Sequence, residues 1–219
     1  SVFEDRSESQ LDSCRFFNNT AAMTGAAAMA VNSTLSVDGC QFGQSTAVYG
    51  GFLFLSRSDV SVSNSDFEEG SASQGGCINA IASTALVIQG VSMISSRAEE
   101  DGGALSVEQG TLSLRDSILS SNAAGSRGGG AYCRNSDCVI QNVSFSDNVA
   151  VANAGGIYAG NGGTLELSDS SFVQNSAEFG GAVNIKSNIT ETVTVTNCIF
   201  IRSEEHTSEL QSHLNLVCR

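Results

Sequence analysis

A phenylalanine-type position recurs eight times along this 219-residue chain and limits the fold more than any other feature. Its successive occurrences are separated by 25 to 28 residues: Phe16, Phe42, Phe67, Met93, Leu119, Phe145, Phe172 and Phe200. Three residues before each stands a second column, which from Gly39 onward holds only Gly, Asn and Asp: Ser13, Gly39, Asn64, Gly90, Asp116, Asn142, Asp169 and Asn197. Gly, Asn and Asp tolerate a left-handed backbone and make turns. A period of this length indicates a solenoid in which each repeat is one structural unit.

Apolar residues keep the same register. Pairs seven and five residues before the phenylalanine position are Leu35/Val37, Val60/Val62, Leu86/Ile88, Leu112/Leu114, Cys138/Ile140, Leu165/Leu167 and Val193/Val195. Because strand side chains alternate between two faces, both members of a pair point to one side of a strand. The residue two before the phenylalanine position is mostly small. This residue and the phenylalanine-type residue together predict a second short strand. A helical repeat would show apolar residues at i, i+3, i+4 and i+7, and no unit does.

A glycine pair followed by apolar residues predicts a third strand in each repeat. The clearest examples are Gly102-Gly103-Ala104-Leu105, Gly129-Gly130-Ala131-Tyr132, Gly155-Gly156-Ile157-Tyr158 and Gly180-Gly181-Ala182-Val183. We therefore expect an all-β chain folded as a right-handed parallel β-helix of about seven coils. Each coil has 25–28 residues and three short strands, and equivalent residues stack about 4.8 Å apart. No coil is stable alone, so stability must come from stacking.

The alternation of F-x-x-N (Phe16–Asn19, Phe145–Asn148, Phe172–Asn175) with G-G-A-[ILVY] resembles the repeat of chlamydial polymorphic outer-membrane proteins. More broadly, it is similar to the right-handed β-helix superfamily with the pectin-lyase fold, which includes pectate lyases. The resemblance covers residues 13–201 and implies the architecture more than any activity. The departures are Gly50-Gly51-Phe52-Leu53, Gly75-Gly76-Cys77-Ile78 and the single Gly25 of the first repeat.

The chain divides into three parts. Residues 1–12 are expected to form a partial coil or N-terminal edge, and residues 13–201 the β-helix domain. Residues 202–219 lack the glycine pair and resemble, codon by codon, translated read-through of a sequencing-library adapter, with a short capping helix as the alternative. Since natural solenoids need capping coils, we expect the exposed ends to favour end-to-end self-association.

Charge and composition exclude some functions. The formal charge of −13 argues against nucleic acid as a partner, and no apolar run approaches the length of a transmembrane segment. Both histidines, His206 and His213, lie in the suspect tail. A polysaccharide lyase or glycoside hydrolase domain lacking its catalytic coils is the enzymatic alternative, but closely spaced Asp residues and a G-H-G motif are missing. No catalytic or cofactor-binding residue is predicted.

Two acidic groups could bind Ca²⁺ through oxygen ligands. They are Glu68, Glu69, Glu99, Glu100 and Asp101, and they follow the phenylalanine position in neighbouring coils, which would place them on one side of the rod. The alternative is a solvated turn that keeps the rod soluble.

The asparagines Asn19, Asn122, Asn148 and Asn175 share one repeat position. Stacked side-chain amides can hydrogen-bond from coil to coil, so we predict a structural ladder in preference to a glycan contact.

The cysteines suggest two disulfides with open alternatives. Cys14 and Cys40 occupy one inward column of adjacent coils, where they form either a bridge or small apolar filler, and filler is favoured because Ser and Val replace them elsewhere. Cys133 and Cys138 could close the turn between them, although the register points Cys138 inward. Zinc is not expected without His or a second C-x-x-C.

The sequence as a whole predicts a non-catalytic extracellular or cell-surface fragment, either a stalk or an adhesin-like surface. Ladders of Ser, Thr, Asn and Gln would make weak multivalent contacts with glycans or extracellular proteins. Sequons at Asn18, Asn32, Asn142 and Asn188 are mild evidence for secretion, and Asn142 lies in the tight turn column.

Overall fold

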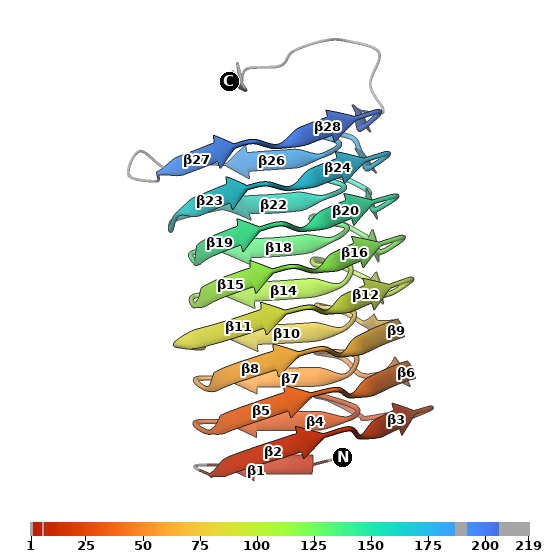
Figure 1. The fold of residues 1–219 in the computed structure, drawn as a ribbon. Helices are drawn as coiled ribbons and strands as arrows, with labels where there is room; N and C mark the ends of the chain where they lie inside the picture. The colour runs from red at the N-terminus through yellow and green to blue at the C-terminus, as the bar shows by residue number, and fades with distance from the viewer. Residues whose placement is uncertain (1, 6, 187–191, 206–219) are drawn as a thin grey trace.

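The structure is a computed structural model that describes residues 2–5, 7–186 and 192–205. These residues form short strands joined by turns and stack into a rod (Figure 1). No helix occurs among them, so no helix in this part of the chain is able to cross a membrane. The all-β prediction is confirmed.

Three parallel sheets run along the rod. Sheet A contains β1 (Val2–Asp5), β4 (Ala28–Val31), β7 (Leu53–Ser56), β10 (Ile78–Ile81), β14 (Leu105–Glu108), β18 (Ala131–Arg134), β22 (Ile157–Gly160) and β26 (Val183–Lys186). Sheet B contains β2 (Glu8–Asp12), β5 (Thr34–Asp38), β8 (Asp59–Ser63), β11 (Ala85–Gln89), β15 (Thr111–Arg115), β19 (Asp137–Gln141), β23 (Leu165–Ser168) and β27 (Val193–Thr196).

Sheet C begins with β3 (Arg15–Phe17), β6 (Gln41–Thr46) and β9 (Asp66–Ala72) and then divides. One branch contains β12 (Ser92–Ile94), β16 (Ile118–Ser120), β20 (Ser144–Ser146), β24 (Ser171–Val173) and β28 (Ile199–Ile201). The other contains β13 (Arg97–Ala98), β17 (Ala123–Ala124), β21 (Val149–Ala150), β25 (Ser176–Ala177) and β29 (Glu204–Glu205).

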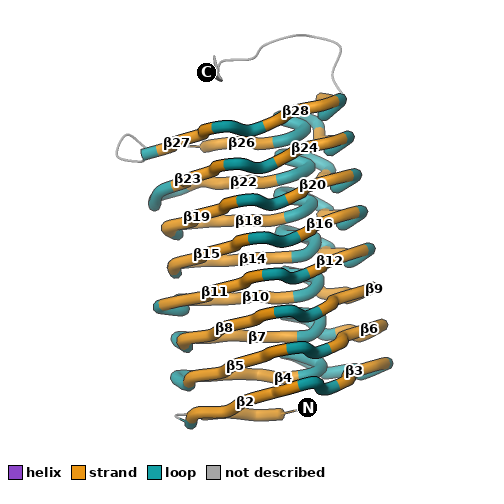
Figure 2. The backbone as a smooth tube through the Cα atoms, in the orientation of Figure 1, coloured by secondary structure: helices purple, strands orange, loops and turns teal. Residues whose placement is uncertain are grey.

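Each turn of the backbone passes through one strand of sheet A, one of sheet B and the sheet C segment, with turns between them (Figure 2). Eight stacked strands in sheets A and B correspond to about seven coils. In Figure 1 the near strands of sheet B run left to right and the paler strands of sheet A run back behind them while the chain climbs. This coil is right-handed, as expected for parallel crossover connections.

The core is built from the columns that the sequence repeat predicts. The phenylalanine position stacks directly on itself: ring centroids are 5.1 Å apart for Phe16 and Phe42 and 4.4 Å for Phe42 and Phe67. A second stack includes Phe145 and Phe172, with centroids 4.8 Å apart. The paired apolar residues of sheet B are buried beside these rings, except in the last coil, where Val193 is 36% exposed. Register along the rod thus places like residues on like residues.

The predicted left-handed column is confirmed in every coil. Each of its residues has a φ between 48° and 64°: Ser13, Gly39, Asn64, Gly90, Asp116, Asn142, Asp169 and Asn197. The structure adds a second left-handed column that composition does not reveal: Asn18, Gln44, Glu69, Ser95, Ser121, Asp147, Gln174 and Arg202. In the later coils this second bend divides the sheet C segment into two short strands, while the three sheets fit the expected three strands per coil.

The glycine motif needs one correction. Register pairs Leu105 with Ala131, and Ala131 with Ile157. The glycine motif had predicted that Leu105 is equivalent to Tyr132. In the coils that contain Ala131 and Ile157, this predicted alignment was wrong by one residue. The consequence is that Tyr132 and Tyr158 lie on the outer side of sheet A.

The expected end regions are partly described. Strands β1 and β2 pair with β4 and β5 in the next coil. Beyond Ile201, Glu204 pairs with Ser176 and Glu205 with Ala177. Residues 206–219, and with them most of the predicted non-native tail, lie outside the described residues, as does Asn188.

Candidate functional site

The turns that join sheet B to sheet C form a polar edge along the rod, which we call the B–C bend. Here an Asn amide repeatedly donates to a carboxylate in the coil below. These bonds are Asn64 Nδ2 to Asp38 Oδ1 at 2.9 Å, Asn142 Nδ2 to Asp116 Oδ1 at 2.8 Å and Asn197 Nδ2 to Asp169 Oδ1 at 2.7 Å. Local bonds of this kind suit Asn and Asp, which also adopt the left-handed turn conformation.

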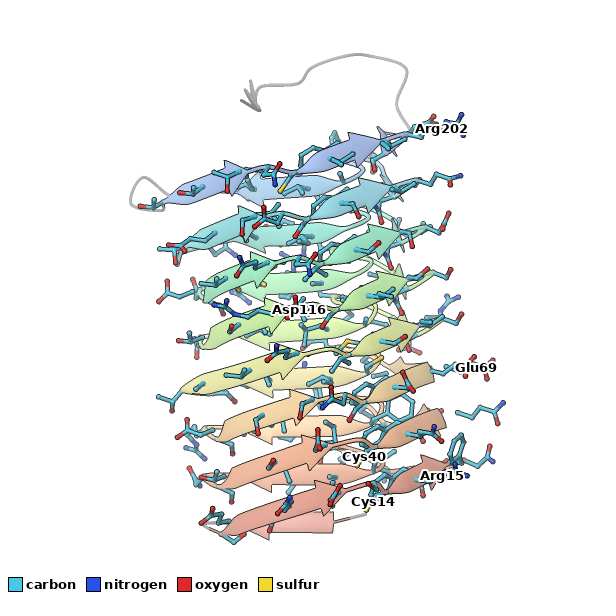
Figure 3. All side chains as sticks on the ribbon, in the orientation of Figure 1. Cys14, Arg15, Cys40, Glu69, Asp116 and Arg202 are labelled. Atoms are coloured by element: carbon cyan, nitrogen blue, oxygen red, sulfur yellow. The ribbon has the colours of Figure 1, made fainter. Side chains whose placement is uncertain are left out.

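The last residue of each sheet B strand extends this hydrogen-bonded series. Gln89 Nε2 donates to Asp116 Oδ2 at 3.0 Å, and Arg115 Nη1 donates to Gln141 Oε1 at 2.7 Å. Lower on the rod, hydrogen bonds from Ser63 and then Asn64 hold the pKa of Asp38 below its usual value. The side chains of the B–C bend are therefore oriented by one another while remaining exposed. Asp116 is labelled at this bend in Figure 3.

Two hollows lie in line beside the B–C bend. The lower hollow, of about 300 Å³, is lined by Phe17, Gln41, Phe42, Asp66, Phe67, Glu68, Ser92 and Ile94. The upper hollow, of about 290 Å³, is lined by Asp116, Ser117, Ile118, Asn142, Val143, Ser144, Asp169 and Ser171.

Register shows that the two hollows share one column of residues. This column is Gln41, Asp66, Ser92, Ile118, Ser144 and Ser171, each paired with the next. Five spacings of about 4.8 Å make this column roughly 24 Å long. We call the two hollows together the B–C groove.

The opposite bend, between sheets A and B, carries a more open hollow of about 420 Å³. Its lining includes Ser83, Gln109, Asn135 and Asp137. Asp137 accepts a bond from Thr164 Oγ1 at 2.9 Å, but among the residues of this bend that the structure describes no comparable series of hydrogen bonds joins carboxylates and amides. The B–C groove is therefore the better-defined candidate for a binding surface.

The two predicted acidic groups occupy different places on the coil. Register pairs Ile94 with Glu68 and Ala98 with Ala72, so Glu99 stacks above Ser73. The prediction that the two acidic groups occupy similar places in neighbouring coils was therefore wrong: Glu68 and Glu69 follow the phenylalanine position by one and two residues, whereas Glu99 follows it by six. Glu99 and Glu100 accept hydrogen bonds from Ser73 Oγ and Gln74 Nε2. Within the described chain, no group of three His, Cys, Asp or Glu side chains converges as a metal site.

Asp101 belongs instead to a partly buried ion pair. Arg127 Nη2 lies 2.6 Å from Asp101 Oδ2, and Arg127 Nε donates to Oδ1 at 2.9 Å. The guanidinium also lies 4.8 Å from the ring centroid of Tyr132 and 5.2 Å from that of Tyr158. Arg127 covers both rings, and burial raises the pKa of Tyr132 to about 12. Sequence reasoning missed this cluster because the motif equivalence placed the tyrosines one position away.

The asparagine ladder is confirmed as a buried structural feature at three of its four positions. Asn122, Asn148 and Asn175 are at most 1% exposed. The Oδ1 atom of each later residue accepts from both the backbone N–H and the Nδ2 of the one before, over 3.0–3.1 Å. Asn19 shares the position but adjoins Ser45, whose Oγ accepts its backbone N–H at 3.3 Å.

The described cysteines are free thiols. Cys14 and Cys40 lie in adjacent coils, as expected (Figure 3), and the Cys14 N–H donates to Cys40 Sγ at 3.3 Å. Cys133 and Cys138 are both buried. The pKa of Cys138 is raised, first by its hydrogen bond with Cys133 and then by burial. All four behave as core side chains in this structure.

Neither a comparison with protein-family models nor one with curated protein sequences finds a match to this chain. The resemblance to chlamydial outer-membrane repeats therefore rests on the motifs alone. What the structure establishes is the parallel β-solenoid.

Proposed function

We propose that this chain is a non-catalytic extracellular or cell-surface β-helix that binds an extended glycan along the B–C groove. The observation that carries the proposal is the single column shared by the two hollows, flanked by exposed Asp, Asn, Gln and Arg side chains. An elongated groove fits a polymer better than a compact ligand.

The chemistry of the B–C bend suits sugar hydroxyls, which both donate and accept hydrogen bonds. Asp116 and Asp169 offer acceptors, whereas Arg115 and Asn142 offer donors. The coil spacing of about 4.8 Å is close to the length of one hexose unit in an extended chain. Each contact contributes only about 0.5–1.5 kcal/mol, so useful affinity comes from repetition along the rod.

The negative charge of the chain restricts which glycans can bind to it. With a formal charge of −13, the chain repels sulfated or uronic-acid polymers. The proposal is therefore restricted to neutral or amine-bearing glycans.

The experiment is a glycan array followed by calorimetric titration of the best ligand. Asn142→Gly should weaken binding about fivefold, since it removes the amide but keeps a residue that tolerates φ 54°. The matched control is Asn135→Gly, which removes an exposed left-handed amide from the opposite bend. Equal loss in both variants, or no glycan bound on the array, would refute the proposed function.

A further inference from the structure

The lower hollow differs from the rest of the groove because an exposed aromatic ring lies in it. Phe17 is 51% exposed at the end of β3. Its ring lies over the backbone of Gly43 in the next coil: a Cβ atom on Gly43 would meet Phe17 Cε1 at 2.6 Å. Glycine at this position thus makes room for the ring, which forms one wall of the hollow.

The same hollow carries two carboxylates without paired cations. Asp66 and Glu68 alternate along β9, so both point outward, and both are exposed. Among the described residues, the ion pairs are Arg127–Asp101 and Arg134–Glu108. The basic residue of the same column, Arg15, is two strands away from Asp66 through Gln41, roughly 9.6 Å by strand spacing. Glu69 adds a further exposed carboxylate at this end of the rod (Figure 3).

An aromatic face beside unpaired carboxylates is the chemistry that recognises an organic cation. Continuity with the B–C groove makes that cation part of the same polymer. We propose that the lower hollow binds a sugar unit with a protonated amino group, whose C–H face packs on Phe17 and whose ammonium contacts Asp66 and Glu68. This inference rests on the proposed function and names its substrate class: a glycan containing free amino sugars.

The ligand test compares two pentamers that differ mainly in charge, a β-linked glucosamine pentamer and its N-acetylated counterpart. At about pH 6, where the amines are protonated, and about 0.15 M salt, we expect the amine form to bind at least tenfold more tightly. Equal binding would overturn the inference and leave the glycan function standing. Binding of neither pentamer would also overturn it, whereas the glycan function is judged by the array.

The protein test uses Glu68→Gln and Phe17→Leu, which keep side-chain size and apolar character near the originals. Glu68→Gln should reduce the preference for the amine form about fivefold or more, and Phe17→Leu should weaken binding of the glucosamine pentamer by a similar factor, both at an unchanged unfolding midpoint. Glu166→Gln is the control, because it makes the same charge change at an exposed position of sheet B. An equal loss in the control would show attraction to net charge alone and overturn the site.

A third measurement separates amino sugars from basic peptides. Tetralysine carries ammonium groups without a sugar ring, so it should bind more weakly than the glucosamine pentamer. If tetralysine binds as tightly and loses affinity in Glu68→Gln, the hollow takes basic peptides and the amino-sugar assignment is wrong.

Discussion

Asn148 donates from its side-chain amide to the side-chain oxygen of Asn175, one coil further along the rod, over 3.0 Å, and both side chains are fully buried. Its second amide hydrogen goes to the Leu119 carbonyl at 2.8 Å, and its oxygen accepts two bonds from Asn122. Each of these hydrogen bonds of the Asn148 side-chain amide thus joins residues of different coils. The buried ladder is part of the stability of the rod, not of its binding surface.

Replacing Asn148 by Leu should lower stability by about 3 kcal/mol, because several buried donors and acceptors lose their partners together. The measurement is the chemical unfolding midpoint. Asn19→Leu is the matched control, since Asn19 shares the repeat position but is only half-buried. A midpoint for Asn148→Leu equal to that of the control would contradict the ladder.

Two buried serines should respond differently to removal of their hydroxyls. Ser65 Oγ accepts from the Cys40 N–H at 3.0 Å and donates to the Ser63 carbonyl at 2.7 Å, so Ser65→Ala should cost about 1–2 kcal/mol. Ser106 Oγ has no partner within the described structure, and Ser106→Ala should change stability by less than about 0.5 kcal/mol. Thermal melts of both variants test this, and a reversed order would be inconsistent with the hydrogen bonding described.

Neighbouring coils approach each other so closely at Gly76 that no other residue fits there. A Cβ atom there would lie 2.1 Å from the Gly103 carbonyl oxygen, so Gly76→Ala should cost more than about 3 kcal/mol or prevent folding. Gly39 needs only its left-handed φ of 60°, with no atom closer than 3.6 Å, so Gly39→Ala should cost about 1–2 kcal/mol. Similar unfolding midpoints for the two variants would show that coil spacing is looser than described.

Burial raises the pKa of the Cys77 thiol to about 12. Because only the thiolate reacts, Cys77 should resist alkylation by iodoacetamide at about pH 8 in the folded protein. Among the described cysteines, Cys14 is half-buried and should be labelled first. Residue-resolved mass spectrometry, with and without denaturant, provides the measurement. Rapid labelling of Cys77 in the native protein would mean that its coil opens.

The sequence predicts the solenoid well because its constraints repeat in every coil. A position such as Asn142 selects its own turn, since Asn adopts the left-handed conformation readily. The second column of bends was missed at Glu69 and Gln174, where coil closure imposes the same conformation on residues without that preference. Stacking on neighbouring coils overrides local propensity at those positions.

The candidate groove was only partly predictable. Polar ladders were expected, but their concentration at the B–C bend depends on bonds between coils, such as Asn142 to Asp116. The lower hollow depends on Phe17 lying over Gly43, a contact between residues 26 positions apart that no local pattern records.

Because neighbouring coils pair in an unbroken register, the number of coils in this rod can change during evolution. Ile78–Ile81 align residue for residue with Leu105–Glu108, so unequal recombination between two such segments deletes or duplicates one whole coil and restores every column across the join. Lineages can therefore extend or shorten the molecule in increments of about 4.8 Å while each remaining coil keeps its contacts. The distance over which a surface is presented can change in this way without any new fold.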